Sequence, residues 1–415
     1  MPLTFRVTPG AARPFKVLEW HGTRMAGGAE AASDVTVHVT TPLLPREVSA
    51  PARHVTPSDG SPSTPHSPGA RRIAAAARIA AIVGCVALLA ALCLLEPRRA
   101  GLATRADGAA ESSSSSRSAA VRLFAFGDWG RNGTFNQSLI AQQMGAVGKQ
   151  MAPQFVVSVG DNFYDEGLTD VNDDEFTRSF TNIYTHRTLQ VPWYAVLGNH
   201  DYYGNALAQL HPALANRDPR WVCRRSMALS LPLCPSGSVD CVDLVDLFLY
   251  DTTPLVAAYR HKKGRRVDWR GLNSANWTQQ EAAQLQELEG WLGNSRARWK
   301  VVVGHHPVFS YGHHGDQQEM IDRVKPLLER YGVDAYLNGH DHDMQHVKRN
   351  DSPVHYFTVG GGSKAWRSDA PSEAPGLRFY FPGQGFSALQ VDRDRLTVAF
   401  YGVDGEQMYS TSLEK

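Results

Sequence analysis

The stretch FVVSVGDNFYDEG, residues 155–167, changes from apolar to polar within a few positions. Its valine-rich first half is typical of a buried β-strand, and a glycine then interrupts the strand pattern. A carboxylate, Asp161, and a phenol, Tyr164, follow at once. Such a stretch is either a solvated loop or the mouth of a site, and the rest of the sequence decides between the two.

Other short apolar runs of the chain end in the same way. The predicted strands are 121–126, 155–159, 193–197, 300–303 and 335–338, and longer amphipathic stretches lie between them. Strands that alternate with helices predict an α/β fold with a largely parallel central sheet. Further strand patterns after residue 353 predict a second sheet of mixed or antiparallel strands.

Each of the five predicted strands is followed by a polar motif that begins with glycine. The motifs are GDWG (127–130), GDNFY (160–164), GNHD (198–201), GHHP (304–307) and GHDH (339–342). One such motif alone is usually a turn. Five of them at successive strand ends indicate a ligand site, because the crevice of an α/β sheet lies beyond the carboxyl ends of its strands.

The side chains in these motifs indicate which metals the site would bind. Carboxylate, amide and imidazole groups suit hard or borderline ions, and none of the five motifs contains cysteine. The donors are too many for a single four-coordinate zinc. Two ions about 3.5–4 Å apart, bridged by one carboxylate, fit better and cleave phosphate esters through a metal-bound hydroxide.

The five motifs, in this order and spacing, resemble those of the purple acid phosphatases. The likeness is to the animal-type, tartrate-resistant branch of the calcineurin-like metallophosphoesterases, and it covers roughly residues 121–410. The resemblance implies two mixed β-sheets packed as a sandwich with flanking helices. One departure is His306, which stands where the animal branch usually has a tyrosine.

The resemblance also implies the role of individual residues. Asp128, Tyr164 and His342 would bind a ferric ion. Asn199, His305 and His340 would bind a divalent iron, zinc or manganese ion, and Asp161 would bridge the two ions. His200 would stabilise charge on the phosphate or protonate the leaving group. A second such histidine falls on His314, with the adjacent His313 as the alternative.

The first 120 residues differ in composition from the rest. Residues 1–72 are rich in Pro, Ala, Ser and Thr, which predicts a disordered tail. Residues 73–95 include 17 consecutive positions without a polar side chain, which predicts a transmembrane signal-anchor. A cleaved signal peptide and a buried core helix are the alternatives. Residues 96–120 are predicted to be a Ser-rich linker, and residues 121–415 are predicted to be a metallophosphoesterase catalytic domain.

Two further features bear on partners and compartment. The formal net charge is +1 and the folded part has no dense basic run, so no nucleic-acid partner is expected. Sequons for N-glycosylation begin at Asn132, Asn136, Asn276 and Asn350. They predict a glycoprotein that is a single-pass membrane protein, with its catalytic domain either lumenal (endosomal or lysosomal) or extracellular.

Three cysteines lie close together after the apolar run. Cys223, Cys234 and Cys241 permit one disulfide with one thiol left over, and the sequence leaves the pairing open.

Together these observations predict a membrane-anchored acid phosphatase that acts on phosphate monoesters, either small molecules or phosphoproteins. A phosphodiesterase or nucleotide phosphohydrolase of the same superfamily is one alternative, and Tyr164 argues against it because the phenolate ligand belongs to the purple branch. A catalytically weak membrane scaffold is another. The presence of all seven implied ligands argues against a scaffold.

Overall fold

The computed structural model describes residues 16–18, 39–41, 120–234, 241–261, 277–366 and 373–415. Near the N-terminus, β1 (Lys16–Leu18) and β2 (Val39–Thr41) pair antiparallel, a pairing that the predicted tail did not include. The predicted membrane segment, 73–95, lies outside the described residues. Within the described part of the chain, no helix combines the length and apolarity that crossing a bilayer requires.

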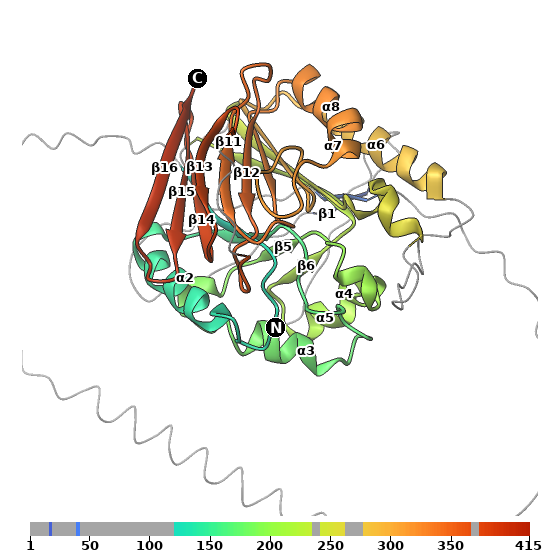
Figure 1. Ribbon diagram of the computed structural model, residues 1–415, viewed down its shortest axis with the longest axis vertical. Helices are drawn as coiled ribbons and strands as arrows, with labels where there is room; N and C mark the ends of the chain where they lie inside the picture. Colours follow the sequence, from blue (N-terminus) through green and yellow to red (C-terminus); the bar gives the residue numbers. More distant parts are fainter. Residues whose placement is uncertain (1–15, 19–38, 42–119, 235–240, 262–276, 367–372) are drawn as a thin grey trace, which may run out of the picture. The chain divides into compact units, whose positions relative to one another are not determined.

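Two mixed seven-stranded sheets form the framework of the part of the chain after residue 120 (Figure 1). The first sheet has the order β16 (Gln407–Glu414), β15 (Arg395–Gly402), β14 (Gly385–Val391), β3 (Val121–Phe126), β4 (Phe155–Ser158), β5 (Trp193–Ala195) and β6 (Trp221–Cys223). The second has the order β13 (Leu377–Phe381), β11 (Met344–Val347), β12 (His355–Val359), β10 (Ala335–Asn338), β9 (Trp299–Val303), β8 (Leu244–Tyr250) and β7 (Ser226–Pro232).

The five predicted strands exist, but they do not share one sheet. Parallel strands β3, β4 and β5 belong to the first sheet, while parallel strands β9 and β10 belong to the second. The expectation of a single, largely parallel central sheet is therefore wrong, and the two-sheet arrangement implied by the resemblance is confirmed. The C-terminal strands β14 to β16 do not build a sheet of their own, because β14 pairs antiparallel with β3 and extends the first sheet.

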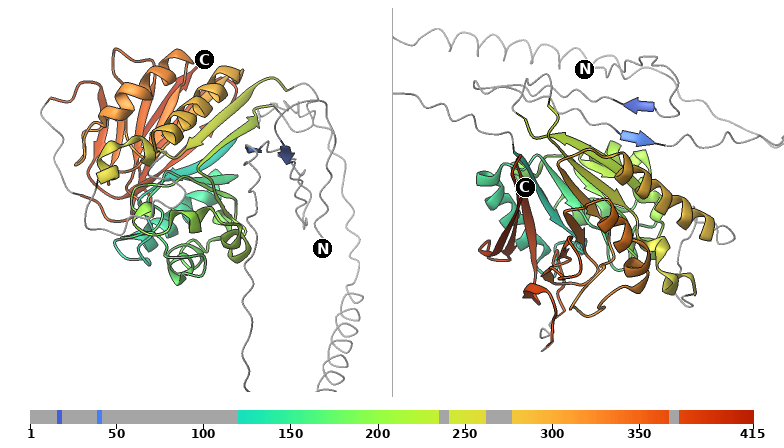
Figure 2. Two further views of the ribbon diagram at one scale, coloured as in Figure 1. Left: turned by 90° about the vertical axis from the view of Figure 1, so that its right-hand side faces the viewer. Right: turned by 90° about the horizontal axis from the view of Figure 1, so that it is seen from above.

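Helices cover the outer face of each sheet (Figure 2). Helices α2 to α5 pack on the first sheet and α6 to α8 on the second. Their bounds are α2 (Gln137–Met151), α3 (Asp174–Phe176), α4 (Ala206–Leu210), α5 (Pro212–Arg217), α6 (Trp277–Asn294), α7 (Gln318–Arg323) and α8 (Lys325–Arg330). A short π-helix spans Thr177–Thr181, and short 3-10 helices span Arg187–Leu189, Asp201–Tyr203, Thr253–Leu255 and Ala257–His261. Helices α7 and α8 are separated at Val324, because Pro326, in the first turn of α8, has no N–H to continue the hydrogen-bond ladder of α7.

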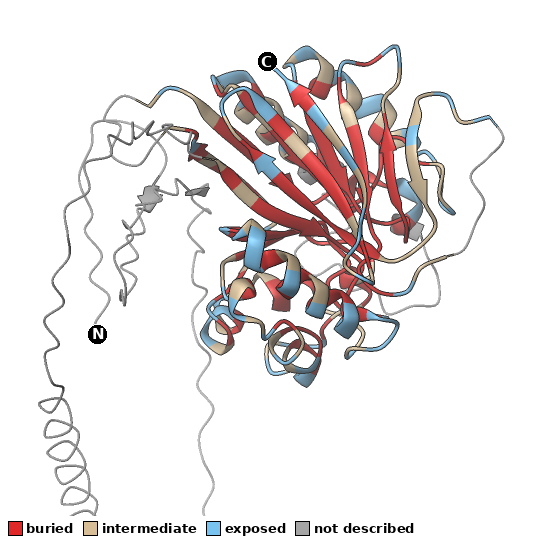
Figure 3. Ribbon diagram, turned by 90° about the vertical axis from the view of Figure 1, so that its left-hand side faces the viewer, coloured by how far each residue is buried: buried red, intermediate tan, exposed pale blue. Residues whose placement is uncertain are grey.

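Burial follows from this layering. The central strands have an apolar layer on both faces, so β4 and β10 are buried along their whole length and β3 at every position except Arg122 (Figure 3). Helix α2 buries Ile140, Ala141, Met144 and Gly148, which recur at helical spacing on one face. An aromatic cluster surrounds Trp129 between the first sheet and its helices. This packing fixes the end of β3, where the first polar motif begins.

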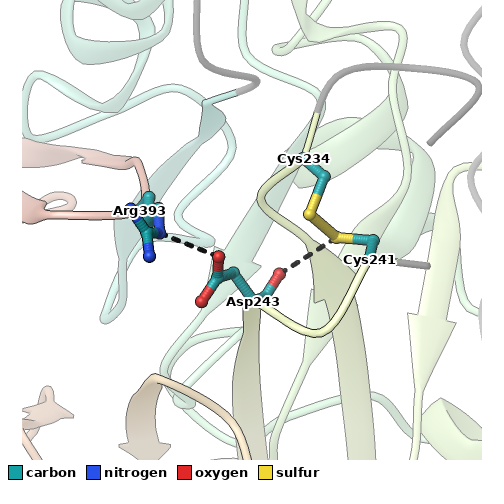
Figure 4. The surroundings of a disulfide bond; sticks show 4 residues. All are labelled: Cys234, Cys241, Asp243 and Arg393. Atoms are coloured by element: carbon teal, nitrogen blue, oxygen red, sulfur yellow. Dashed lines mark hydrogen bonds and ion pairs between the residues drawn. A yellow bond between two sulfur atoms is a disulfide. The ribbon is translucent and has the colours of Figure 1, made fainter.

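The structure also resolves the disulfide. Cys234 and Cys241 are bonded, with their Cα atoms 5.7 Å apart, and they close the connection between β7 and β8. Close by, Asp243 forms an ion pair of 2.9 Å with Arg393 (Figure 4). Cys223 is the cysteine left over, and it is a buried free thiol.

Candidate metal centre

The five polar motifs meet at one edge of the sandwich. Backbone hydrogen bonds join them directly: the N–H of Asp128 donates to the carbonyl of Gly160 at 3.0 Å, and that of Gly339 donates to the carbonyl of His305 at 3.0 Å. The first bond links β3 to β4, and the second links β10 to β9. The motif side chains are therefore held together by main-chain contacts as well as by their own.

A first group of donor atoms surrounds the Tyr164 hydroxyl. Its Oη lies 2.9 Å from Asp128 Oδ1, 2.9 Å from Asp161 Oδ2 and 3.0 Å from His342 Nε2. All four side chains are buried. An octahedral ion with bonds of about 2.0–2.1 Å has adjacent ligand atoms about 2.9 Å apart, so this spacing fits one small, hard ion.

A second group of donor atoms surrounds His305. Its Nε2 lies 3.2 Å from Asn199 Oδ1 and 3.4 Å from Asp161 Oδ2. The ring of His340 lies 5.2 Å from that of His305. The same oxygen of Asp161 thus faces both groups. The donors are oxygen and nitrogen without thiolate, so the residues present fit two hard or borderline ions.

Both carboxylates are anchored by their other oxygen. Asp161 Oδ1 accepts a hydrogen bond of 2.7 Å from the backbone N–H of His200. Asp128 Oδ2 accepts one of 3.1 Å from the backbone N–H of His340. Because one oxygen of each group is fixed in this way, the second is directed into the donor cluster.

The motif glycines make room for these carboxylates. A Cβ at Gly198 would collide with the Asp161 carboxylate, and a Cβ at Gly339 would collide with that of Asp128. Asp128, Asp161 and His340 have φ angles of 62°, 50° and 72°. Such left-handed conformations are uncommon for residues other than glycine and cluster at functional sites.

Backbone carbonyls set the orientation of two histidines. The Nδ1–H of His305 donates to the carbonyl of Val159 at 3.0 Å, and that of His342 donates to the carbonyl of Lys364 at 2.6 Å. Each bond leaves Nε2 unprotonated in the neutral ring and directed at the donor cluster. This arrangement is the usual support for a metal-ligating histidine.

His306 is close to the site but is engaged elsewhere. The ring nitrogens of His305, His306 and His340 lie within 4.8 Å of one another, which makes His306 a possible donor by distance. However, its Nδ1 lies 2.8 Å from Thr252 Oγ1 and its Nε2 lies 3.0 Å from Tyr259 Oη. Since both ring nitrogens have hydroxyl partners, we leave His306 outside the ligand set.

The electrostatics of the donor cluster suit cation binding. Burial alone would raise the pKa of Asp161, but His305 and His200 hold the pKa of this carboxyl well below its usual range. Burial alone would lower the pKa of His305, but the Asp161 carboxylate raises this pKa to about 9. Burial and the carboxylates of Asp128 and Asp161 raise the pKa of the Tyr164 phenol well above its ordinary value. Metal ions would displace these protons on binding.

The two predicted catalytic histidines lie beside the donor groups. His200 is half-buried, and its Nδ1–H donates to the carbonyl of Asp165 at 2.6 Å, which leaves Nε2 available. The ring of His314 stacks on that of His340 at 4.0 Å. His313 contacts the ring of Trp366 at 4.7 Å. Of the two adjacent histidines, His314 is therefore the one whose ring stacks on a candidate ligand.

Three residues of the site were not predicted. Trp366 stacks on His342 at 4.3 Å, and the guanidinium of Arg131 lies 3.7 Å from the ring centre of Tyr164. Asp201 is fully buried and accepts hydrogen bonds from backbone N–H groups after β4 and β5. Asp201 had a signal, because it belongs to the motif GNHD. Arg131 and Trp366 had none, since their contacts arise only on folding.

Comparison with known proteins agrees with this geometry. Residues 121–344 match the calcineurin-like phosphoesterase family. Purple acid phosphatase 17 of Arabidopsis thaliana is 46% identical over 293 residues, which is 70% of this chain and 83% of that protein. Tartrate-resistant acid phosphatase type 5 of Oryctolagus cuniculus is 31% identical over 312 residues, 71% of this chain and 91% of that protein. The plant relative is thus more similar to the chain than this animal one.

Solved structures support the fold. GAP50, described as the anchor in the inner membrane complex of Plasmodium, has a TM-score of 0.60 at 22% identity and covers 71% of this chain and 89% of its own. Purple acid phosphatase PPD1 from yellow lupin (Lupinus luteus) seeds has a TM-score of 0.51 at 16% identity, over 72% of this chain and 54% of its own. At these identities the likeness concerns the fold alone. By its sequence relatives, the chain belongs to the calcineurin-like phosphoesterases and, within that family, is an acid phosphatase of the purple acid phosphatase type.

Proposed function

We propose that the protein hydrolyses phosphate monoesters at a dinuclear centre of Fe(III) and a divalent iron, zinc or manganese ion. The observation that carries this proposal is the position of Asp161 Oδ2, which lies 2.9 Å from Tyr164 Oη and 3.4 Å from His305 Nε2. One oxygen therefore faces two donor groups, and only one of the two contains a phenol. An anionic phenolate suits a hard trivalent ion.

The residues of the chain have distinct tasks in this proposal. When bound, the two ions supply an acidified water and positive charge for the phosphoryl oxygens. His200, with its Nε2 available, stabilises charge on the phosphate or protonates the leaving oxygen. His314 is exposed, its ring lies 4.0 Å from that of His340, and it is placed to contact the same phosphate. The substrate is a small phosphomonoester or a phosphoprotein.

Two alternative functions account for the site less well than phosphomonoester hydrolysis. A phosphodiesterase or nucleotide phosphohydrolase of the superfamily would not account for the phenol of Tyr164 among the donors. A scaffold without catalysis has to be considered, because the Plasmodium anchor shares the fold. A scaffold has no need of metal ligands, whereas in this chain the predicted donors converge in a buried cluster.

We further propose that residues 73–95 anchor the protein in a membrane as a single-pass span. The catalytic domain then lies in the lumen of an endosome or lysosome, or outside the cell. The disulfide between Cys234 and Cys241 supports an oxidising compartment. Asn350 is an exposed sequon position and is the proposed glycan acceptor, whereas the Asn132 side chain is already bonded to Glu175.

Tyr164→Phe tests the ferric site. The purified full chain should be coloured, because a phenolate bound to Fe(III) gives a charge-transfer band, and the substitution should abolish that band in the visible absorption spectrum. Tyr203→Phe is the matched control and should keep the colour, since Tyr203 contacts the ring of His200 and is not among the candidate ligands. A wild-type chain that holds two metal ions per molecule and is colourless would contradict the proposal.

His200→Ala tests the catalytic role of His200. The kcat for p-nitrophenyl phosphate should fall by about 10²- to 10⁴-fold, the usual contribution of a general acid, while metal content stays near that of the wild type. His314→Ala should also lower kcat. His313→Ala is the control and should retain activity. Loss of metal from His200→Ala would assign this residue to the ligands and refute its proposed role.

Deletion of residues 73–95 tests the anchor. The full chain should remain with cell membranes after an alkaline carbonate wash, and the deletion should release it. An equally long deletion of residues 42–64 serves as the control and should leave the chain in the membrane fraction. Release of the unaltered chain by the wash would show that 73–95 is not a span.

A further inference from the structure

The side chain of Arg131 lies against the face of Tyr164. Its guanidinium carbon is 3.7 Å from the centre of the Tyr164 ring and 5.5 Å from that of Phe135. Arg131 lies in the connection between β3 and α2, three positions after the candidate ligand Asp128. A cation thus contacts the one phenol side chain among the proposed ligands.

Arg131 is held in this position at both ends. Its backbone N–H donates to Gln137 Oε1 at 3.0 Å, and its carbonyl accepts from the N–H of Thr134 at 3.0 Å. At the far end, Nη1 lies 2.7 Å from Asp165 Oδ1. The side chain of Arg131 is only 10% exposed, and its buried Nε has no hydrogen-bond partner among the described residues.

The paired carboxylate does not cancel the charge of Arg131 at the ring. The side chain of Asp165 is 71% exposed, so water screens its negative charge. The guanidinium is buried at the ring face, where the local dielectric is low and its field on Tyr164 is strong. Because Asp165 is exposed, its ion pair with Arg131 adds little stability, so support of the loop does not by itself account for the stacking of Arg131 on Tyr164.

We propose that Arg131 is a positioning residue that sets how strongly the Tyr164 phenolate donates electrons to the ferric ion. A positive charge over the ring stabilises the filled orbitals of the phenolate and so weakens its donation. The proposal rests on the proposed ferric site. Arg131 thereby raises the energy of the charge-transfer transition and favours the reduced state of the iron that Tyr164 binds.

Neutral substitutions of Arg131 test this role in the metal-loaded full chain. Arg131→Gln and Arg131→Met should shift the visible band to longer wavelength. They should also lower the Fe(III)/Fe(II) reduction potential of the iron that Tyr164 binds, at unchanged iron content. Arg131→Lys restores a positive charge and should move both quantities back towards the wild type. The measurements are visible absorption spectroscopy and a spectroscopic redox titration.

Arg178→Gln is the matched control. Arg178 pairs with Glu175 at 3.2 Å, and its side chain is 55% exposed. This variant should leave the band and the potential unchanged. A shift as large as that of Arg131→Gln would count against a specific role for Arg131.

The outcomes separate this inference from the proposed function. A wild-type band that neutral variants of Arg131 leave unmoved would overturn the inference and leave the ferric site intact. A wild-type chain that contains iron but has no band would overturn the ferric site itself. If both neutral variants lose iron or fail to fold, Arg131 has a structural role and the inference is wrong.

Discussion

The metal centre depends on how its two carboxylates divide their oxygens. Asp161 accepts the backbone N–H of His200 with one oxygen and turns the other towards both donor groups. Asp128 accepts the N–H of His340 with one oxygen and turns the other towards the group around Tyr164. Each anchoring bond joins motifs from different strands, and that of Asp128 crosses from the first sheet to the second. The donors are therefore positioned by the main chain, which holds them more firmly than flexible side chains could.

The strand order and packing of the two sheets bring the five polar motifs together. Parallel strands end at the same edge of a sheet, so β3, β4 and β5 deliver three motifs and β9 and β10 deliver two. Packing then fixes each end: Trp129, next to Asp128, is fully buried in aromatic contacts, and Gly198 and Gly339 leave the space that the carboxylates fill. A larger side chain at either glycine would displace a carboxylate rather than only a turn.

The sequence could predict only features that depend on neighbouring residues in the chain. The five strands and their polar ends carry their own pattern, so they could be located, and the resemblance then supplied the roles of Asp161 and Tyr164. Strand partners are not local, and for that reason the division into two sheets and the joining of β14 to β3 did not follow from periodicity. The stacking of Arg131 on Tyr164 and of Trp366 on His342 had no sequence signal, because loops distant in the chain meet only on folding.

The shared oxygen of Asp161 is what distinguishes a two-ion centre from two adjacent binding sites or from a buried polar cluster. The most direct test of this account is the number of metal ions bound by the purified full chain, measured by mass spectrometry of the elements. The account predicts two ions per chain, at least one of them iron. A chain that binds a single ion, or none, would contradict it.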